Sequence, residues 1–151
     1  MKPYRKFKNF QIRWKEALGR PECPYLYRWT FIFFGYSIRI HHWLRSDDRR
    51  FFHDHSTDLI SIILKGRYKN VTPNGEFEVK AGSIWKAKAG SIWKAKAASR
   101  HYLDIPKEGA WTLLLCSRKY RNWGFWDKED HMLRPLEYFH RYGIIQDENY
   151  Q

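Results

Sequence analysis

Short segments of strand-forming residues, each closed by a turn signal, recur along most of this chain and constrain its fold more than any other feature. Residues 25–34 and 36–44 are rich in aromatic and β-branched side chains, and Gly35 separates them. The other segments of this kind are 59–65, 67–71, 76–80, 111–117 and 120–126. The dipeptide Asn74-Gly75 is a strong hairpin signal between two of them. Many short strands separated by turns predict an antiparallel barrel or sandwich.

Helical signals are confined to the two ends of the chain. Four apolar residues near the N-terminus recur at spacings of three and four, namely Phe7, Phe10, Trp14 and Leu18. This spacing predicts a short basic helix within residues 1–20. A second helix is expected over residues 134–143, because Pro135 suits a first helical turn and Gly143 suits a helix end. We therefore expect one all-β domain, 1–151, with a barrel over 23–127 between two short helices.

Composition excludes several classes of protein. Hydrophobic residues make up 43% of the chain and aromatic residues 19%, which suits one packed core rather than a disordered chain. The longest apolar run, 29–34, is too short for a membrane span or a secretory signal. Two cysteines, Cys23 and Cys116, are too few for a disulfide scaffold, so we expect a cytoplasmic protein.

Positive charge is concentrated in two segments. The formal net charge is +12, and residues 1–20 and 80–100 carry the excess of lysine and arginine over acidic residues. Such segments attract acidic or phosphate-bearing partners, although solvated lysines on an ordinary basic protein explain them equally well. Nucleic-acid binding, with Trp85 and Trp93 stacking on bases, is an alternative that we do not favour because the aromatic residues are needed for the core.

A perfect tandem repeat lies within the second basic segment. Residues 81–88 and 89–96 have the same sequence, Ala-Gly-Ser-Ile-Trp-Lys-Ala-Lys. Because eight is an even number, either copy places its side chains on the same faces of a strand. We expect the additional copy to extend a hairpin or form a loop, whether the duplication is natural or engineered.

The strongest chemical signal is the sequence His53-Asp54-His55, followed by Asp58. Histidines two residues apart on a strand project from the same face, where their rings can bind one metal ion. A carboxylate from Asp58 and a third imidazole from His101 complete a predicted ligand set. Such a set suits Fe(II), Mn(II), Ni(II) or Zn(II). The alternative is a polar turn between two strands.

These residues resemble the motifs of the cupin superfamily. The first cupin motif has the form Gly…His-x-His-x(3–4)-Glu-x6-Gly, and His53, His55 and Gly66 match it. The second motif, which ends in a histidine, is matched more loosely by the segment from Gly82 or Gly90 to His101. The chain also resembles a cupin-like group found in bacteriophage and bacterial genomes, over roughly residues 25–127. The residues that carry this second resemblance are Arg45-Ser46-Asp47-Asp48, His-Asp-His-x-x-Asp and Trp123-Gly124-Phe125.

The resemblance implies a double-stranded β-helix, or jelly roll, with the metal ligands inside. It departs from the family at the glutamate position, where this chain has Leu59, and Asp58 is the expected substitute. Either Arg39 and His41 or, from the other face of their strand, His42 line the interior, and Arg39 is the expected substrate contact. The resemblance implies a small-molecule or acidic ligand and a homodimer. It favours a metal-dependent dioxygenase over an isomerase or hydrolase, with a non-catalytic binding module as the alternative.

Overall fold

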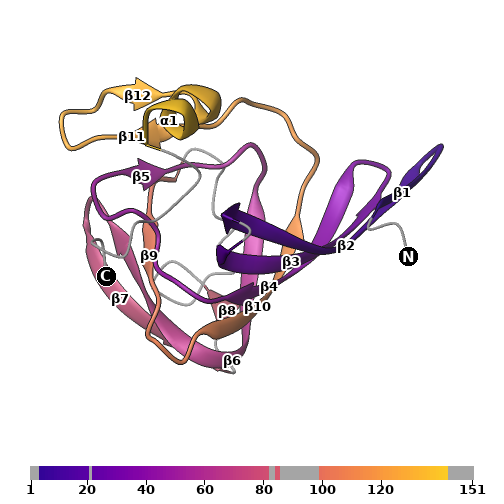
Figure 1. Cartoon of the computed structure of the whole chain (residues 1–151), viewed down its shortest axis with the longest axis horizontal. Helices are drawn as coiled ribbons and strands as arrows, with labels where there is room; N and C mark the ends of the chain where they lie inside the picture. The colour runs from indigo at the N-terminus through magenta and orange to yellow at the C-terminus, as the bar shows by residue number, and fades with distance from the viewer. Residues whose placement is uncertain (1–3, 21, 82–83, 86–98, 143–151) are drawn as a thin grey trace.

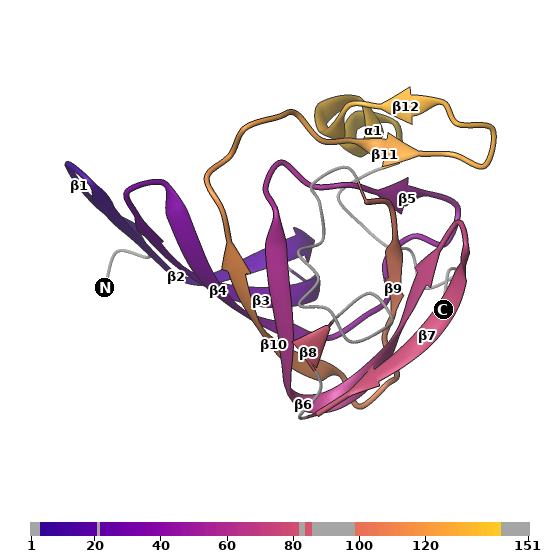
Figure 2. The ribbon, with the colours of Figure 1, turned by 180° about the vertical axis from the view of Figure 1, so that it is seen from behind.

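The computed structural model describes residues 4–20, 22–81, 84–85 and 99–142. The second copy of the tandem repeat and most of the first lie outside these residues, and so does the predicted additional loop. Within the described part, the chain is built from antiparallel strands that curl into a barrel, with one short helix against one end (Figure 1). The view from behind shows the same closed arrangement (Figure 2). The predicted all-β class is therefore confirmed.

The predicted N-terminal helix is wrong, because this segment is a β-hairpin. Strand β1 (Tyr4–Phe7) pairs with β2 (Phe10–Arg20) and reaches beyond the barrel (Figures 1 and 2). The step of three from Phe7 to Phe10 spans the hairpin turn at residues 8–9, and the steps of four that follow are also compatible with two-residue alternation. A bulge lies within β2, where Lys15 has a φ of 49°. A helix would also have needed a buried stripe, whereas Phe7 and Trp14 are half exposed. Pairing with the next strand therefore overrides the local pattern.

Four long strands form the part of the barrel wall that lines one side of the cavity described below. They are β3 (Cys23–Phe33), β4 (Tyr36–Trp43), β10 (Ala110–Cys116) and β6 (Leu59–Thr72), adjacent in that order. Along β4 the buried residues alternate with more exposed ones, so that Ser37, Arg39, His41 and Trp43 share the inner face.

Strand β6 changes partners halfway along its length. Its first part pairs with β10 and with β8 (Ile84–Trp85), and its second part pairs with β7 (Gly75–Lys80) and β9 (Tyr102–Asp104). The change falls at Gly66, where φ is +82° and a Cβ atom would lie 2.7 Å from the Gly109 carbonyl oxygen. Only glycine tolerates this bend. The sequence predicted two strands, 59–65 and 67–71, separated at Gly66, whereas the chain bends there and continues as one strand.

A second, smaller sheet closes one end of the barrel. It consists of β12 (Met132–Leu133), β11 (Phe125–Trp126) and β5 (Phe52–His53), and the helix α1 (Pro135–Tyr142) packs on it. Tyr138 of α1 is buried and stacks on Phe125 with ring centroids 3.7 Å apart. The C-terminal helix is thus confirmed, and it holds the short strands over the barrel end (Figure 1).

The hydrophobic core lies on the inner faces of these strands. Its fully buried members include Leu26 of β3, Ile63 of β6 and Ala110 of β10. Other members of this core, including Leu59 and Leu103, line the cavity beside the histidines. Apolar and polar side chains therefore share the interior of the barrel.

Candidate metal centre

Two segments far apart in the sequence bring three histidines together. His53 ends β5, His55 follows two residues later, and His101 immediately precedes β9. The backbone N–H of His53 donates to the His101 carbonyl over 2.8 Å, and the His101 N–H donates back over 3.0 Å. This reciprocal pair, an isolated antiparallel bridge, fixes the distance between the two segments.

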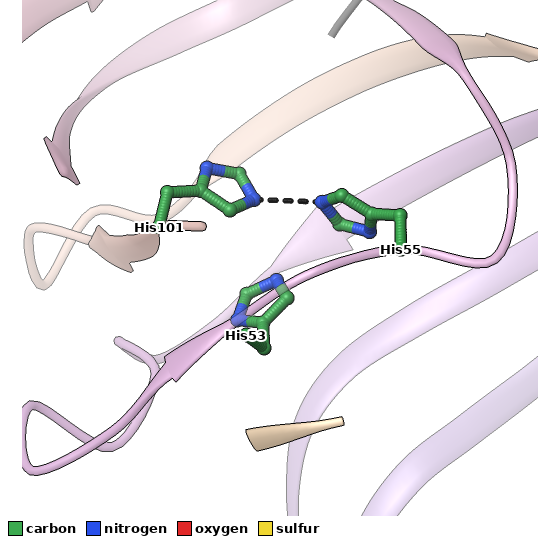
Figure 3. A group of neighbouring side chains, drawn as sticks. All are labelled: His53, His55 and His101. Carbon is green, nitrogen blue, oxygen red and sulfur yellow. Dashed lines mark hydrogen bonds between the residues drawn. The ribbon is translucent and has the colours of Figure 1, made fainter. Parts of the chain in front are cut away.

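The three imidazoles point toward a common centre (Figure 3). One nitrogen from each ring lies within 4.8 Å of the others, and no acidic or cysteine residue of the described chain joins this group. Nε2 of His55 lies 2.8 Å from Nε2 of His101. The His53 ring centroid is 5.0 Å from that of His55 and 4.7 Å from that of His101.

Neighbouring residues orient two of the three rings. Nδ1 of His101 lies 2.9 Å from Oδ1 of Asn70, a residue that is completely buried on β6. Since the amide oxygen can only accept, Nδ1 carries the proton and Nε2 keeps its lone pair. Nδ1 of His53 lies 3.7 Å from Oδ2 of Asp47, which also accepts a hydrogen bond from the Leu103 N–H. These contacts resemble the outer partners that orient metal-bound histidines in other proteins.

Burial favours the neutral form of two of these imidazoles, His55 and His101. It is the main reason why the pKa values of His55 and His101 lie well below the ordinary 6.5, and the nearby His53 lowers both further. Arg39 and His41 also lower the pKa of His55, which shows that they lie within electrostatic reach of it. A neutral imidazole with a free lone pair is the form that binds a metal.

The donor set fits a divalent transition metal. Two imidazole nitrogens bound to one ion at about 2.1 Å are about 3.0 Å apart when their bonds are perpendicular and about 3.4 Å apart in a tetrahedron. The 2.8 Å separation of the His55 and His101 nitrogens is close to the first value. His53, His55 and His101 would hold the ion, and a set of three imidazoles would leave it able to accept a further ligand.

Asp58 is not one of this group, contrary to the expectation from the sequence. Its Oδ1 accepts a hydrogen bond of 2.7 Å from the Tyr120 hydroxyl, and its backbone pairs with Ser117. The reason is the alternation of β6, which begins at the next residue. Leu59 projects into the barrel and lines its cavity, so the preceding carboxylate points away from it.

The aspartate between the two histidines has a role that the sequence did not suggest. Asp54 is 1% exposed, and Oδ1 accepts from the Gly124 N–H over 2.7 Å. Its Oδ2 accepts from Arg121 over 2.9 Å and from the Trp126 indole over 3.2 Å. These bonds hold residues 121–126 against the histidine segment. They also explain why the strand predicted over 120–126 is reduced to β11.

A cavity of about 350 Å³ lies beside the three histidines. Its wall includes Arg28 of β3 and the pair Arg39 and His41 of β4. His42 lies on the other face, where its ring stacks on Trp111 at 4.2 Å. The structure thus resolves the alternative left open by the sequence, and the expected substrate contact Arg39 does line the interior.

Several residues of the site were not predicted as part of it, although Asp47 belongs to the segment that carries the resemblance to the cupin-like group. Asn70 and Asp47 lie in segments that meet the histidines only in the folded chain, and Arg28 reaches the cavity through its pairing with His41. Aromatic side chains also line the cavity: Tyr25, Trp43, Phe51, Tyr68, Trp123, Phe125, Tyr138 and Phe139. The aromatic content of the sequence therefore serves the cavity as well as the core.

Comparisons with known proteins support the fold through structure alone. No family model and no curated protein matches the sequence. An RmlC-like cupin protein from Ralstonia eutropha is similar with a TM-score of 0.51 at 14% identity, over 91% of this chain and 89% of that one. This likeness decides the fold. The chain has a cupin-like fold.

Other solved structures are more distant. A sugar phosphate isomerase of the cupin superfamily from Silicibacter pomeroyi gives a TM-score of 0.45 at 12% identity, over 72% of this chain and 77% of that one. Oxalate decarboxylase from Bacillus subtilis gives 0.42 at 14% identity, over 77% of this chain and only 27% of that one. The chain therefore spans about a quarter of that enzyme's length. In the described part of this cupin-like chain, no helix has the length and apolar character needed to cross a membrane.

Proposed function

We propose that this cupin-like protein binds one divalent transition metal through His53, His55 and His101. The observation that carries the proposal is the convergence of three imidazoles, one fully buried and two half-buried, with the buried ring of His101 oriented by Asn70. In the metal-free protein a hydrogen bond of 2.8 Å between Nε2 of His55 and Nε2 of His101 holds two of the rings together, and a metal would replace this contact with bonds to the ring nitrogens.

We further propose that the metal acts on a small molecule bound in the adjacent cavity. Fe(II), Mn(II), Ni(II) and Zn(II) all suit an imidazole set with open positions, and dioxygenase chemistry is the leading reaction class. A metal there would polarise a bound oxygen atom or activate a bound small molecule. Arg39 lines the cavity and is proposed to contact the substrate.

Elemental analysis of protein purified without chelators tests the metal. We expect about one transition metal ion per chain, and we expect its loss in His53→Ala and His55→Ala. His140→Ala is the matched control, because His140 is exposed on α1 away from the three histidines. Protein that contains no metal and does not take up added Fe(II), Mn(II), Ni(II) or Zn(II) would refute the proposal.

A second candidate is a binding module without catalysis. It is favoured by one observation: apolar Leu59 lines the cavity at the position where the cupin motif has a glutamate. The two candidates differ in turnover. Metal-loaded protein that consumes dioxygen with a small-molecule substrate supports the enzyme, whereas bound metal with no consumption across a broad metabolite panel supports the binding module.

We further propose a cellular location and an oligomeric state for this protein. Cys23 and Cys116 are both free, which agrees with the reducing cytoplasm. A homodimer, implied by the resemblance to cupins, would appear as twice the chain mass in sedimentation equilibrium. Nucleic-acid binding was expected through the two basic segments, 1–20 and 80–100, and most of the second lies outside the described part of the chain.

A further inference from the structure

The cavity has a second polar wall besides the three histidines. In the pairing of β3 with β4, Arg28 lies opposite His41, and Arg39 lies two residues farther along on the same face. All three line the same cavity as His53, His55 and His101. This wall therefore presents two guanidinium groups and an imidazole to whatever the cavity holds.

Arg39 differs from Arg28 in its partners. Arg28 is paired with Glu16, whose Oε2 lies 3.1 Å from the arginine Nε. For Arg39, the described chain provides one side-chain hydrogen bond, from Nε to the Ser37 hydroxyl over 3.2 Å, and no carboxylate within ion-pair distance. Its two terminal amino groups remain available on the inner face. A largely buried cation without a counter-ion is costly, so its presence indicates an anionic ligand.

His41 supplies an independent indication. Its side chain is 6% exposed, and neither ring nitrogen has a hydrogen-bond partner within the described residues. Burial and the two neighbouring arginines lower the pKa of His41, so the ring is neutral and offers one donor and one acceptor. Buried polar atoms are nearly always satisfied in native proteins, and His41 is one of the residues that line the cavity. Both nitrogens are themselves inaccessible, so a ligand in the cavity would satisfy one of them once the ring turns toward it.

The charges of the cavity select the class of anion. Arg39 contributes a positive charge on which Glu16, the ion-pair partner of Arg28, acts only from beyond ion-pair distance, and its planar guanidinium matches the two oxygens of a carboxylate. Asp47 and Asp48 line the same cavity, and they would oppose a doubly charged phosphate. Asp48 is held by Arg50 and Tyr138, so it does not neutralise Arg39.

We infer that Arg39 and His41 form a subsite for the carboxylate group of a small monoanionic acid. The inference names the substrate class of the proposed metal centre and in that respect rests on the proposed function. The subsite itself consists of side chains that bind no metal. The cavity of about 350 Å³ holds the remainder of such a molecule between this subsite and the three histidines.

Calorimetric titration with matched acids and amides tests the inference. The probes are acetate, propionate and benzoate, each compared with its neutral amide, and inorganic phosphate. We expect at least one acid to bind at least 10-fold more tightly than its amide and than phosphate. Three acids that bind no better than their amides, or phosphate that binds best, would overturn the inference.

Variants assign the binding to this wall. For the best acid, Arg39→Gln is expected to weaken binding about 10- to 100-fold, which is the usual effect of losing hydrogen bonds to a charged group. Arg39→Lys keeps the charge but loses the planar fork, so an intermediate affinity is expected. His41→Phe is expected to weaken binding by about 10-fold. The matched control is Arg67→Gln, because Arg67 is exposed on β6 and paired with Glu78. Circular dichroism and the thermal midpoint establish that each variant is folded.

The same titrations in chelator-treated and zinc-loaded protein separate the two proposals. If the protein takes up no metal but still binds the acid in a way that depends on Arg39, the metal centre is refuted and the subsite is supported. Normal zinc binding combined with acid binding that is unchanged in both Arg39 variants and in His41→Phe would refute the subsite and leave the metal centre standing.

Discussion

Acidification should unfold the metal-free protein over a narrow pH range because of its buried imidazoles. His41, His55 and His101 all have pKa values well below 6.5 in the folded protein, mainly through burial. In the unfolded chain they titrate near the ordinary 6.5. The unfolded state therefore binds more protons as the pH falls below about 6.5, and stability decreases in that direction.

The size of the effect follows from the number of protons. Each histidine that is charged only in the unfolded state contributes about 1.4 kcal/mol per pH unit, so three contribute about 4 kcal/mol per pH unit. Integrated from about pH 6.5 to about pH 5, the loss is about 5 kcal/mol. Since domains of this size are usually stable by about 5–15 kcal/mol, most of the stability can be lost above the range where carboxylates titrate.

Urea unfolding at half-unit steps from about pH 7 to about pH 5, with a chelator present, measures this slope. His41→Gln should reduce the slope by about one third, because it removes one of the three imidazoles. The exposed His140→Gln should leave the slope unchanged. A wild-type slope below about 1.4 kcal/mol per pH unit would mean that the buried rings take up protons in the folded state, and the reasoning would fail.

Three further substitutions probe separate parts of the structure. Asn70→Leu removes the acceptor for His101 and should weaken Zn(II) binding about 10- to 100-fold in competition with a chromophoric chelator, whereas unchanged affinity would show that Asn70 does not orient the ring. Asp54→Ala removes the acceptor of three hydrogen bonds, including that from Arg121, and should lower the free energy of unfolding by about 3 kcal/mol in urea at neutral pH. A loss under about 1 kcal/mol would contradict that role. Arg39→Met replaces a largely buried cation and should raise the free energy of unfolding by about 1 kcal/mol in the same assay, and a decrease would show that Arg39 supports the fold rather than a ligand.

The strands could be predicted because alternation and turn signals are local. The hairpin predicted at Asn74-Gly75, for example, does join β6 to β7, although its two turn residues are Pro73 and Asn74 and Gly75 already pairs with Thr72. The prediction for the N-terminal segment failed because a hairpin turn between Phe7 and Phe10 happens to give a helix-like spacing, and the pairing that makes the segment a strand comes from residues 23–33. A local pattern cannot contain that long-range pairing.

The candidate site was predictable only in part for the same reason. His53 and His55 are two residues apart and could be recognised together, and the cupin resemblance suggested His101. Asp58 was expected to add a carboxylate, but its side chain bonds to Tyr120 instead. The sequence does not define where β6 begins, and so it does not define which way Asp58 points. Asn70 contacts His101 across 31 positions of sequence, a separation that no spacing rule covers.

X-ray absorption spectroscopy of the zinc-loaded protein tests the central claim most directly. The account predicts a first shell that includes three imidazole nitrogens at about 2.0–2.1 Å, reduced in number in His53→Ala, His55→Ala and His101→Ala. A first shell without imidazole scattering, or one that is the same in all three variants, would contradict it.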